Sequence, residues 1–497
     1  MKKIFNIGAI AFLLIFAGTS CKKSYLETTP TDQVATDIVF STTKNGWAAL
    51  NGIHRILYSQ IFGVQAQGGQ SGNMLYMDIL GDDVVFNTSS NSWLRSEYQW
   101  ISHRDPTSNM LYYNYQFYYV IIDNANMILA NIDAAEGSES DKNAIKGQAL
   151  TYRAWAYFQM IQLFGERYVA GGANSGLGVP LRLAPGTDAI PRNTVAEVYT
   201  QINADLDQAI TLLASYNRSS DKSQLDVHVT KGIKARVALV QEDWASAIKF
   251  AQEARAGFSL MTNANYLSGF NNYENVEWMW SSRIQSDQTN YFYSFFAYMS
   301  ANYNSTAIRT SPKSIFSVLY NKISATDVRK KLWDPTGKNT TDFPVPASTA
   351  SRYPYMSRKF LVANTSLSIG DVPYMRAAEM YLIEAEAEAR SGDENTARST
   401  LYTLAVNRDP SYTMSTNTGA ALVDEIMTQR RIELWGEGFR FYDLKRTNSP
   451  LNRTGGNHSG TYTNGVMQVP AGDKRWQFLI PQDEINYTNG MVVQNPQ

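Results

Sequence analysis

The sequence contains a single cysteine, Cys21, among its 497 residues. A framework of intrachain disulfides is therefore excluded, and packing alone must stabilise the folded chain. Long apolar runs are also missing beyond residue 20, so no later segment has the length needed to span a bilayer. Histidine is scarce, and the four histidines show no metal-ligand spacing: His54, His103, His228 and His458. Metal catalysis therefore has little support.

An excess of positive charge is absent as well. The formal net charge is −1, and removal of residues 1–20, which hold two lysines and no acids, changes it to −3. Nucleic-acid binding would require a clustered basic face, so we expect no nucleic-acid partner. Gly171-Gly172 is followed by neither a lysine nor a helix start, so no phosphate-binding loop is present. We expect no cofactor; a structural Ca²⁺ is compatible with the many Asp and Asn residues, but no acidic loop motif supports it.

The first 21 residues have the pattern of an export signal. Met1-Lys2-Lys3 supplies a positive start, Ile7 to Ala17 an apolar core, and Gly18-Thr19-Ser20 small residues before Cys21. As a helix the core rises about 16 Å, roughly half of a bilayer's hydrocarbon thickness, so it is too short to be a membrane span. Small residues before a cysteine are typical of a bacterial lipoprotein signal. This predicts a signal peptide over 1–20, lipidation of Cys21 and a leash over 21–42. The alternative is an ordinary signal peptide that happens to end before a cysteine. Gly18 departs from the lipoprotein pattern, in which this place more often carries leucine.

Helical patterns dominate the rest of the chain. Apolar residues at helical spacing predict helices over 43–60, 109–132, 144–163 and 195–213. Thr194 followed three residues later by Glu197 predicts a capping box at the start of the last of these.

Two later segments, 230–256 and 377–404, each predict a pair of antiparallel helices. Alanines lie at the positions where such helices cross, and Ser391-Gly392-Asp393 supplies the turn of the second pair. Both pairs resemble tetratricopeptide units. We therefore expect an all-α fold, with tetratricopeptide-like helix pairs forming a scaffold in a single domain over 43–497. Long irregular insertions near 80–104, 260–310 and 334–371 exceed the usual loop length and are expected to carry the binding surface.

Five motifs, in order, resemble a known family. The strongest is the stretch from Gln429 to Arg446, QRRIELWGEGFRFYDLKR. The others are Tyr152-Arg153-Ala154 through Leu163-Phe164-Gly165, Gly178-Val179-Pro180-Leu181, Tyr374 to Glu379 with Glu384 to Ala387, and Leu479 to Ile485 with Gln494-Asn495-Pro496. Together they closely resemble the SusD/RagB family, the surface glycan-binding lipoproteins of Bacteroidetes-type nutrient uptake systems. The resemblance covers nearly the whole chain.

The resemblance implies a function. A member of this family would be anchored to the outer membrane by its lipidated cysteine, facing the cell surface. There it would capture an oligosaccharide or polysaccharide and pass it to a SusC-like TonB-dependent transporter, without making or breaking a bond. Some relatives capture peptides instead, and that alternative stays open, as does a scaffold with only protein partners.

Aromatic residues in polar surroundings are the candidates for ligand binding. The chain holds 30 Tyr and 10 Trp. An aromatic ring covers the apolar C–H face of a sugar, while polar side chains bond its hydroxyl groups. The candidates within the insertions are Trp93, Trp100, Trp280, Tyr298 and Tyr303. The alternative for each is packing of an insertion against the helical body. Trp155, Trp244 and Trp435 lie on helical faces and are expected in the core.

A glycoside hydrolase is the least favoured alternative. Glu433 and Glu437 have the residue type of an acid–base pair. Arginines spaced three residues from acids predict the ion pairs Arg430–Glu433, Glu437–Arg440 and Arg440–Asp443. Arginines beside both glutamates would keep them ionised, whereas a general acid must hold a proton. We therefore expect a partly buried structural network here.

Overall fold

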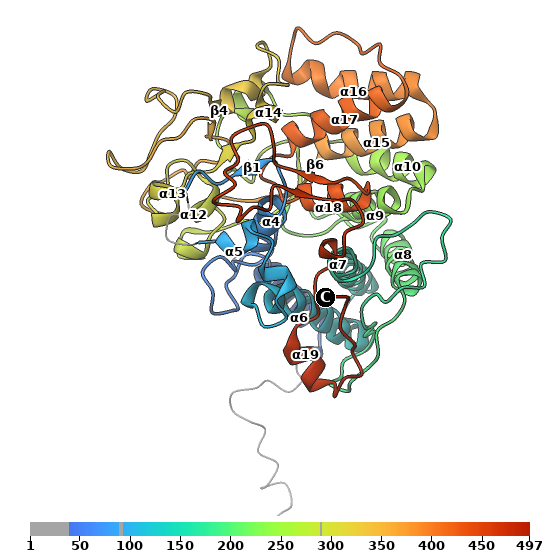
Figure 1. Cartoon of the computed structure of the whole chain (residues 1–497). Coiled ribbons are helices and arrows are strands. Elements are labelled where there is room, and N and C mark those ends of the chain that lie inside the picture. The colour runs from blue at the N-terminus through green and yellow to red at the C-terminus, as the bar shows by residue number, and fades with distance from the viewer. Residues whose placement is uncertain (1–38, 89–92, 289–290) are drawn as a thin grey trace, which may run out of the picture.

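The computed structural model describes residues 39–88, 93–288 and 291–497 (Figure 1). The predicted signal peptide and Cys21 lie outside these residues. Phe40 is already buried in the core, so the folded body includes residues 39–42, the end of the predicted leash. Among the described residues, no helix is both long enough and apolar enough to cross a bilayer.

The long helices of the N-terminal half occupy the middle and lower parts of the view in Figure 1. They are α3 (Thr43–Ile56), α4 (Gln70–Ile79), α6 (Asn109–Asn131), α7 (Glu139–Phe164) and α8 (Val195–Leu212). α7 packs between α6 and α8. The predicted capping box is present, with Thr194 and Glu197 bonding each other's backbone N–H. α7 begins five residues before the predicted start, because Ser138 caps it by accepting a hydrogen bond from the N–H of Asp141.

The two predicted helix pairs are α9 (Val227–Gln241) with α10 (Trp244–Arg255) and α15 (Ala377–Ser391) with α16 (Glu394–Arg408). Both turns are built alike. A left-handed residue ends the first helix, Glu242 or Gly392, and an aspartate caps the second, Asp243 or Asp393. α10 packs on α15, and α15 packs on α17 (Gly419–Glu433). The all-α fold with tetratricopeptide-like pairs is confirmed.

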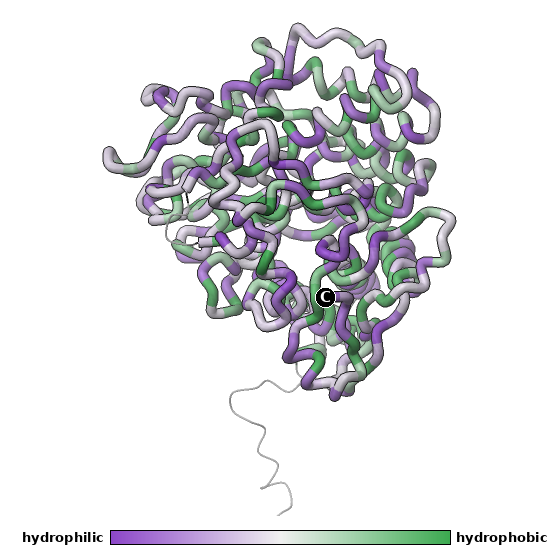
Figure 2. Tube along the Cα trace, in the orientation of Figure 1, coloured by the Kyte–Doolittle hydropathy of each residue, from purple (hydrophilic) through white to green (hydrophobic). Residues whose placement is uncertain are grey.

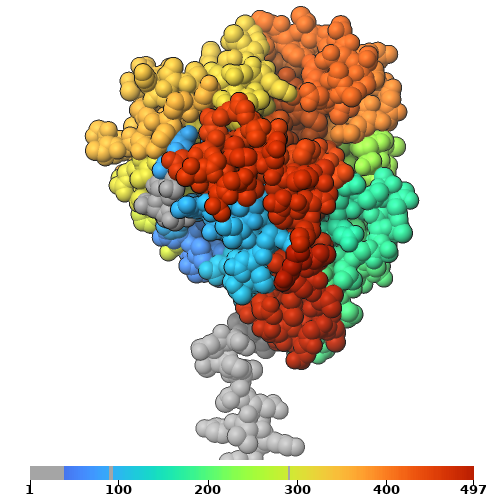
Figure 3. All heavy atoms as spheres, in the orientation of Figure 1, coloured from blue at the N-terminus to red at the C-terminus, as the bar shows by residue number. Residues whose placement is uncertain are grey.

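The C-terminal segment returns across both halves. It contains α18 (Arg440–Arg446) and α19 (Gln482–Tyr487). Backbone N–H groups of Phe478 and Leu479 donate to the carbonyls of Leu163 and His103, which ties this segment to the N-terminal helices. Figure 3 shows its residues, in red, running down the front of the molecule. One large core cluster therefore includes residues from Phe40 to Val492.

The insertions and the other connections between the long helices hold short elements. β1 (Val84–Val85), β3 (Ser314–Ile315), β5 (Met356–Ser357) and β4 (Trp333–Asp334) form an antiparallel sheet in that order, β2 (Trp278–Ser281) pairs with β6 (Pro373–Arg376), and β7 (Leu451–Asn452) pairs with β8 (Gln468–Val469). The short α-helices are α5 (Arg95–Tyr98), α11 (Asn263–Tyr266), α12 (Phe296–Met299), α13 (Thr306–Thr310) and α14 (Ser317–Tyr320). The 3₁₀ turns are η4 (Ser102–Arg104), η5 (Ile132–Ala134), η6 (Ser286–Gln288), η7 (Tyr291–Tyr293), η8 (Val328–Leu332) and η9 (Lys474–Trp476).

The insertions and the helical scaffold also differ in hydropathy. The loop around 335–355 projects from the body in Figure 1, and in Figure 2 it is mostly polar or neutral in colour. The helices behind it alternate between apolar and polar positions, as amphipathic scaffold helices do. The insertions thus lie on a rigid helical base.

Candidate functional site

Charged side chains in the interior connect the insertions to the scaffold. The buried charge network consists of four acids and four bases: Glu277, Asp327, Glu433, Glu437, Arg329, Lys359, Arg376 and Arg408. At its centre Glu433 accepts from Nη1 of Arg376 at 3.0 Å and Nη2 of Arg408 at 3.0 Å. The formal charges sum to zero, which is what a water-excluded cluster of ions requires.

The predicted buried network is therefore present, but its predicted pairs are wrong. The helix is broken between Glu433, the last residue of α17, and Arg440, the first of α18, which removes the helical spacing of Glu437 and Arg440. The other two predicted pairs each lie within one helix, but their members bond partners on other elements. Arg430 pairs instead with Asp443 at 2.8 Å. Arg440 pairs with Asp82 at 2.6 Å and does not bond Glu437 or Asp443.

Neither glutamate of the suggested acid–base pair is suited to catalysis. Burial disfavours the ionised form of Glu433, but Arg408, Arg376 and Arg329 outweigh it and hold the pKa of Glu433 well below its usual range. Burial acts in the same way on Glu437, and Arg376 and Lys359 lower its pKa. Both side chains are enclosed by protein, so substrate cannot reach them in this conformation.

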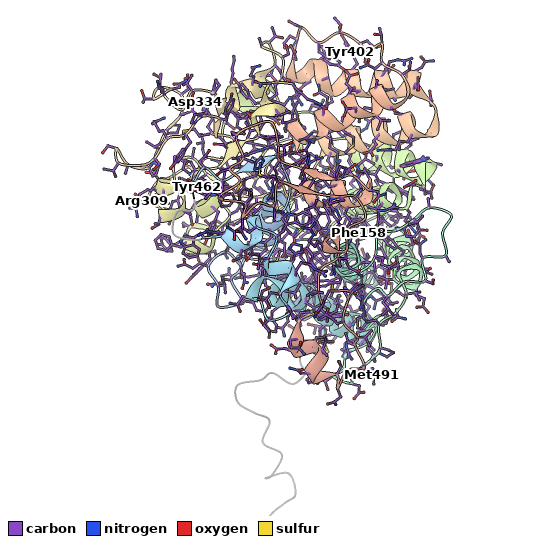
Figure 4. All side chains as sticks on the ribbon, viewed as in Figure 1. Phe158, Arg309, Asp334, Tyr402, Tyr462 and Met491 are labelled. Atoms are coloured by element: carbon purple, nitrogen blue, oxygen red, sulfur yellow. The ribbon has the colours of Figure 1, made fainter. Side chains whose placement is uncertain are left out.

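Three of the five predicted ligand-binding residues come together on one side of the molecule. Trp93 precedes α5, and its ring lies 6.0 Å from that of Tyr298 on α12, at an interplanar angle of 65°. Tyr303 follows α12, and its ring lies 6.4 Å from that of Phe292 on η7. With Tyr291 these residues form what we call the aromatic cluster: Trp93, Tyr291, Phe292, Tyr298 and Tyr303. α13 directly follows it, and its Arg309 is labelled on that side in Figure 4.

The aromatic cluster has an inner and an outer part. Tyr298 and Tyr303 are each 3% exposed and belong to the core, whereas Tyr291 and Phe292 are 50% and 49% exposed. Burial raises the pKa values of Tyr298 and Tyr303, so both hydroxyls stay protonated at neutral pH. The buried ring of Tyr303 thus supports the exposed ring of Phe292. An exposed ring held this way offers an apolar face to a ligand at small entropic cost.

Trp100 and Trp280 lie elsewhere, in the interior. Trp100 donates from Nε1 to the carbonyl of Leu80 at 2.9 Å and packs edge-on against Trp476. Trp280 is on β2, 1% exposed, with its ring 5.3 Å from that of Trp155. Both pack the insertions against the helical body in this conformation. A ligand-binding role for these two, as for the other three, stays a prediction.

The sequence contains a further signal of this surface, at Phe292. Phe292 lies in the run Tyr291-Phe292-Tyr293, an aromatic triplet that directly follows the polar stretch 285–290. Of the expected core residues, Trp155 and Trp435 are each 1% exposed, and Trp244 is partly buried against the core.

Within the described ranges, no group of three or more His, Cys, Asp or Glu side chains is arranged to hold a metal ion. Two aspartates that precede the aromatic cluster in sequence are engaged in ion pairs: Asp83 with Arg431 at 2.6 Å and Asp82 with Arg440. A structural calcium ion stays an untested expectation.

Comparisons with known proteins agree with the architecture. Residues 27–240 match a SusD-like family model described as starch-binding and associating with the outer membrane, and residues 263–497 match the SusD family model. The chain belongs to the SusD/RagB family.

Individual relatives share this family. SusD-like protein P38 of Formosa agariphila is 23% identical over 518 residues, covering 92% of this chain and 94% of that protein. SusD-like protein P2 of the same organism is 29% identical over 211 residues, which span 42% of this chain and only 38% of P2.

Solved structures agree in fold. A SusD-like carbohydrate-binding protein from Bacteroides vulgatus superposes with a TM-score of 0.80 at 25% identity, covering 91% of this chain and 97% of that one. A SusD superfamily protein from Bacteroides thetaiotaomicron superposes with a TM-score of 0.78 at 23% identity, covering 92% of this chain and 100% of that one. A laminarin-binding SusD-like protein superposes with a TM-score of 0.70 at 20% identity, covering 92% of this chain and 100% of that one.

Proposed function

We propose that this SusD-family protein captures a saccharide through the aromatic cluster. The observation that carries the proposal is the exposure of Tyr291 and Phe292, two neighbouring rings half in solvent, of which Phe292 rests against the buried ring of Tyr303. Large aromatic residues are normally covered in a folded protein, so two adjacent exposed rings indicate a contact surface. Sugars suit such rings because their C–H faces are apolar.

The relatives support a saccharide as the ligand. The B. vulgatus protein of the same fold is named carbohydrate-binding, and another structural relative is named laminarin-binding. A peptide is the competing ligand, since it can also contact aromatic rings. It would draw more of its affinity from backbone hydrogen bonds, and loss of one ring would weaken it less.

The proposal includes a cellular setting. The protein would be anchored to the outer membrane through a lipidated Cys21, face the cell surface and deliver its ligand to a SusC-like TonB-dependent transporter. Support comes from the N-terminal signal pattern and from a family model described as associating with the outer membrane. On this proposal the protein is not an enzyme, and the enclosure of Glu433 and Glu437 by arginines and a lysine supports that part.

Calorimetry on the chain lacking residues 1–21 tests the proposal. The panel contains neutral and acidic polysaccharides and peptide digests, and each mixture is afterwards assayed for released reducing sugar. Heat with at least one polysaccharide and no sugar release is the expected result. Heat only with peptides would replace the saccharide by a peptide, and sugar release would show that the protein is a hydrolase.

A further inference from the structure

A second surface, far from the aromatic cluster, has the chemistry of a binding site. A groove of about 420 Å³ lies between α6, the loop 180–190 and α19. This volume is within the range of small-molecule sites. α6 and α19 lie at the lower pole of Figure 1, whereas α12 and α13 lie on the left; Met491, labelled in Figure 4, and the C-terminal residues seen in Figure 3 mark the same pole.

Two tyrosine hydroxyls fix the walls of this groove. Tyr119 on α6 donates to the carbonyl of Pro180 at 2.8 Å, which holds one end of the loop against the helix. Tyr487 on α19 donates to the carbonyl of Thr187 at 3.0 Å, which holds the other end. The ring of Tyr487 remains 65% exposed, the most exposed of the large apolar or aromatic side chains in the described part of the chain. The groove is thus a built feature with an open aromatic face.

A buried tyrosine hydroxyl in the groove lies beside Glu484 and Tyr119 without an ordinary hydrogen bond to either. Tyr115 is 3% exposed and lines the groove, yet its hydroxyl makes no hydrogen bond of ordinary geometry within the described residues. Burial, followed by the nearby carboxylate of Glu484, raises the pKa of Tyr115 far above its usual value, so it remains a donor. Burial also raises the pKa of Glu484. A ligand hydroxyl, which both accepts and donates, can bridge this tyrosine and this glutamate.

The other lining residues define the class of ligand. Three carboxylates and one guanidinium face the groove: Asp123, Asp188, Glu484 and Arg182. This excess of negative charge disfavours an anion such as a uronate or a sulfated sugar. Gln116 and Asn124 add amide groups that bond hydroxyls, and Ile190 adds an apolar contact. Hydroxyl-bonding groups beside an exposed ring suit a neutral saccharide.

We infer that this groove is a second saccharide site, which takes neutral sugar units between Tyr487 and α6. The inference rests on the proposed function for its ligand class, but it concerns different residues. The two sites lie on different sides of the molecule, so occupancy of one does not require the other.

Crystals of the chain lacking residues 1–21, soaked separately with laminarihexaose, cellohexaose, xylohexaose, mannohexaose and oligogalacturonate, test the inference. We expect density for at least one neutral sugar against Tyr487 and none for the acidic oligomer. Sugar at the aromatic cluster but never in the groove would overturn this inference and leave the proposed function standing. Sugar in the groove alone would support it and count against the aromatic cluster. Density at neither site with any neutral oligosaccharide would overturn both.

A matched pair of variants checks the groove in solution. In a Phe292→Ala background, Tyr487→Ala removes the open ring, and Met491→Ala removes a 48% exposed side chain from the same segment without lining the groove. We expect Tyr487→Ala to weaken binding of the soaked neutral sugar about tenfold and Met491→Ala to leave it unchanged. Equal effects of the two variants would contradict the assignment.

Discussion

Glu433 is the residue on which the buried charge network depends most. It is bonded by Arg376, Arg408 and Arg329, and none of these side chains reaches solvent. A buried ion pair is not in itself a strong source of stability, but removing one partner leaves an uncompensated charge. The cost of a substitution therefore depends on how completely the partner is enclosed.

Glu433→Gln should lower the free energy of unfolding by about 3–5 kcal/mol, because three arginines lose their shared carboxylate. Asp133→Asn is the control, since Asp133 pairs with Lys146 while its side chain is 68% exposed, and such a pair contributes less than about 1 kcal/mol. Chemical denaturation measures both. Similar losses in the two variants would contradict the description of the network.

Asp78 should make stability depend on pH. This carboxyl on α4 is buried and accepts a hydrogen bond from the N–H of Gly438, and burial raises its pKa from the ordinary 3.8 to about 8. Between these two values the unfolded chain has lost the proton while the folded chain keeps it, so rising pH costs the folded state stability.

The variant Asp78→Asn stays neutral at every pH. Its free energy of unfolding, relative to that of the unsubstituted chain, should therefore rise from about pH 5 to about pH 8. Denaturant titrations at both pH values measure this difference. A difference that is constant, or that falls with pH, would show that Asp78 is ionised in the folded protein.

At the scale of elements, the break between α17 and α18 positions Glu433 and Glu437, two of the four acids of the buried charge network. Gly438 has a φ of 85°, and a Cβ there would lie 2.7 Å from the Cα of Met74 on α4. The absence of a side chain at Gly438 thus lets α4 pack directly against the backbone between α17 and α18. α4 itself had no predictable pattern, because all ten of its residues are buried and an all-round buried helix has no polar face to reveal its period.

Gly438→Ala should therefore destabilise the protein more than Gly257→Ala. Both glycines have a φ of 85°, so both substitutions carry the same left-handed strain of about 1–3 kcal/mol. Gly257 has no atom within 4 Å of its added Cβ, whereas Gly438 meets backbone. Overpacking should add about 1–3 kcal/mol at Gly438 alone. Thermal melts of the two variants compare them, and equal losses would contradict the close approach of α4.

At the scale of the whole molecule, the sequence predicted what is local. The amphipathic helices, the capping box at Thr194 and the two alanine-rich helix pairs all follow from neighbours within a few turns. The burial of the candidate aromatic residues does not follow from such near neighbours. Trp100 is covered by Trp476, which is remote in the chain, while Phe292 is half exposed in a stretch of similar composition. Only tertiary contacts decide whether an aromatic ring is buried in the interior or exposed to a ligand.

The affinity of Phe292→Ala for the polysaccharide that gives the largest heat in calorimetry tests the central claim most directly. Met414→Ala is the control, because Met414 is equally exposed, at 50%, in the loop after α16. The account predicts that Phe292→Ala weakens binding at least about tenfold, or 1.4 kcal/mol, while Met414→Ala binds like the unsubstituted chain. Unchanged affinity in Phe292→Ala would show that the aromatic cluster does not hold the ligand.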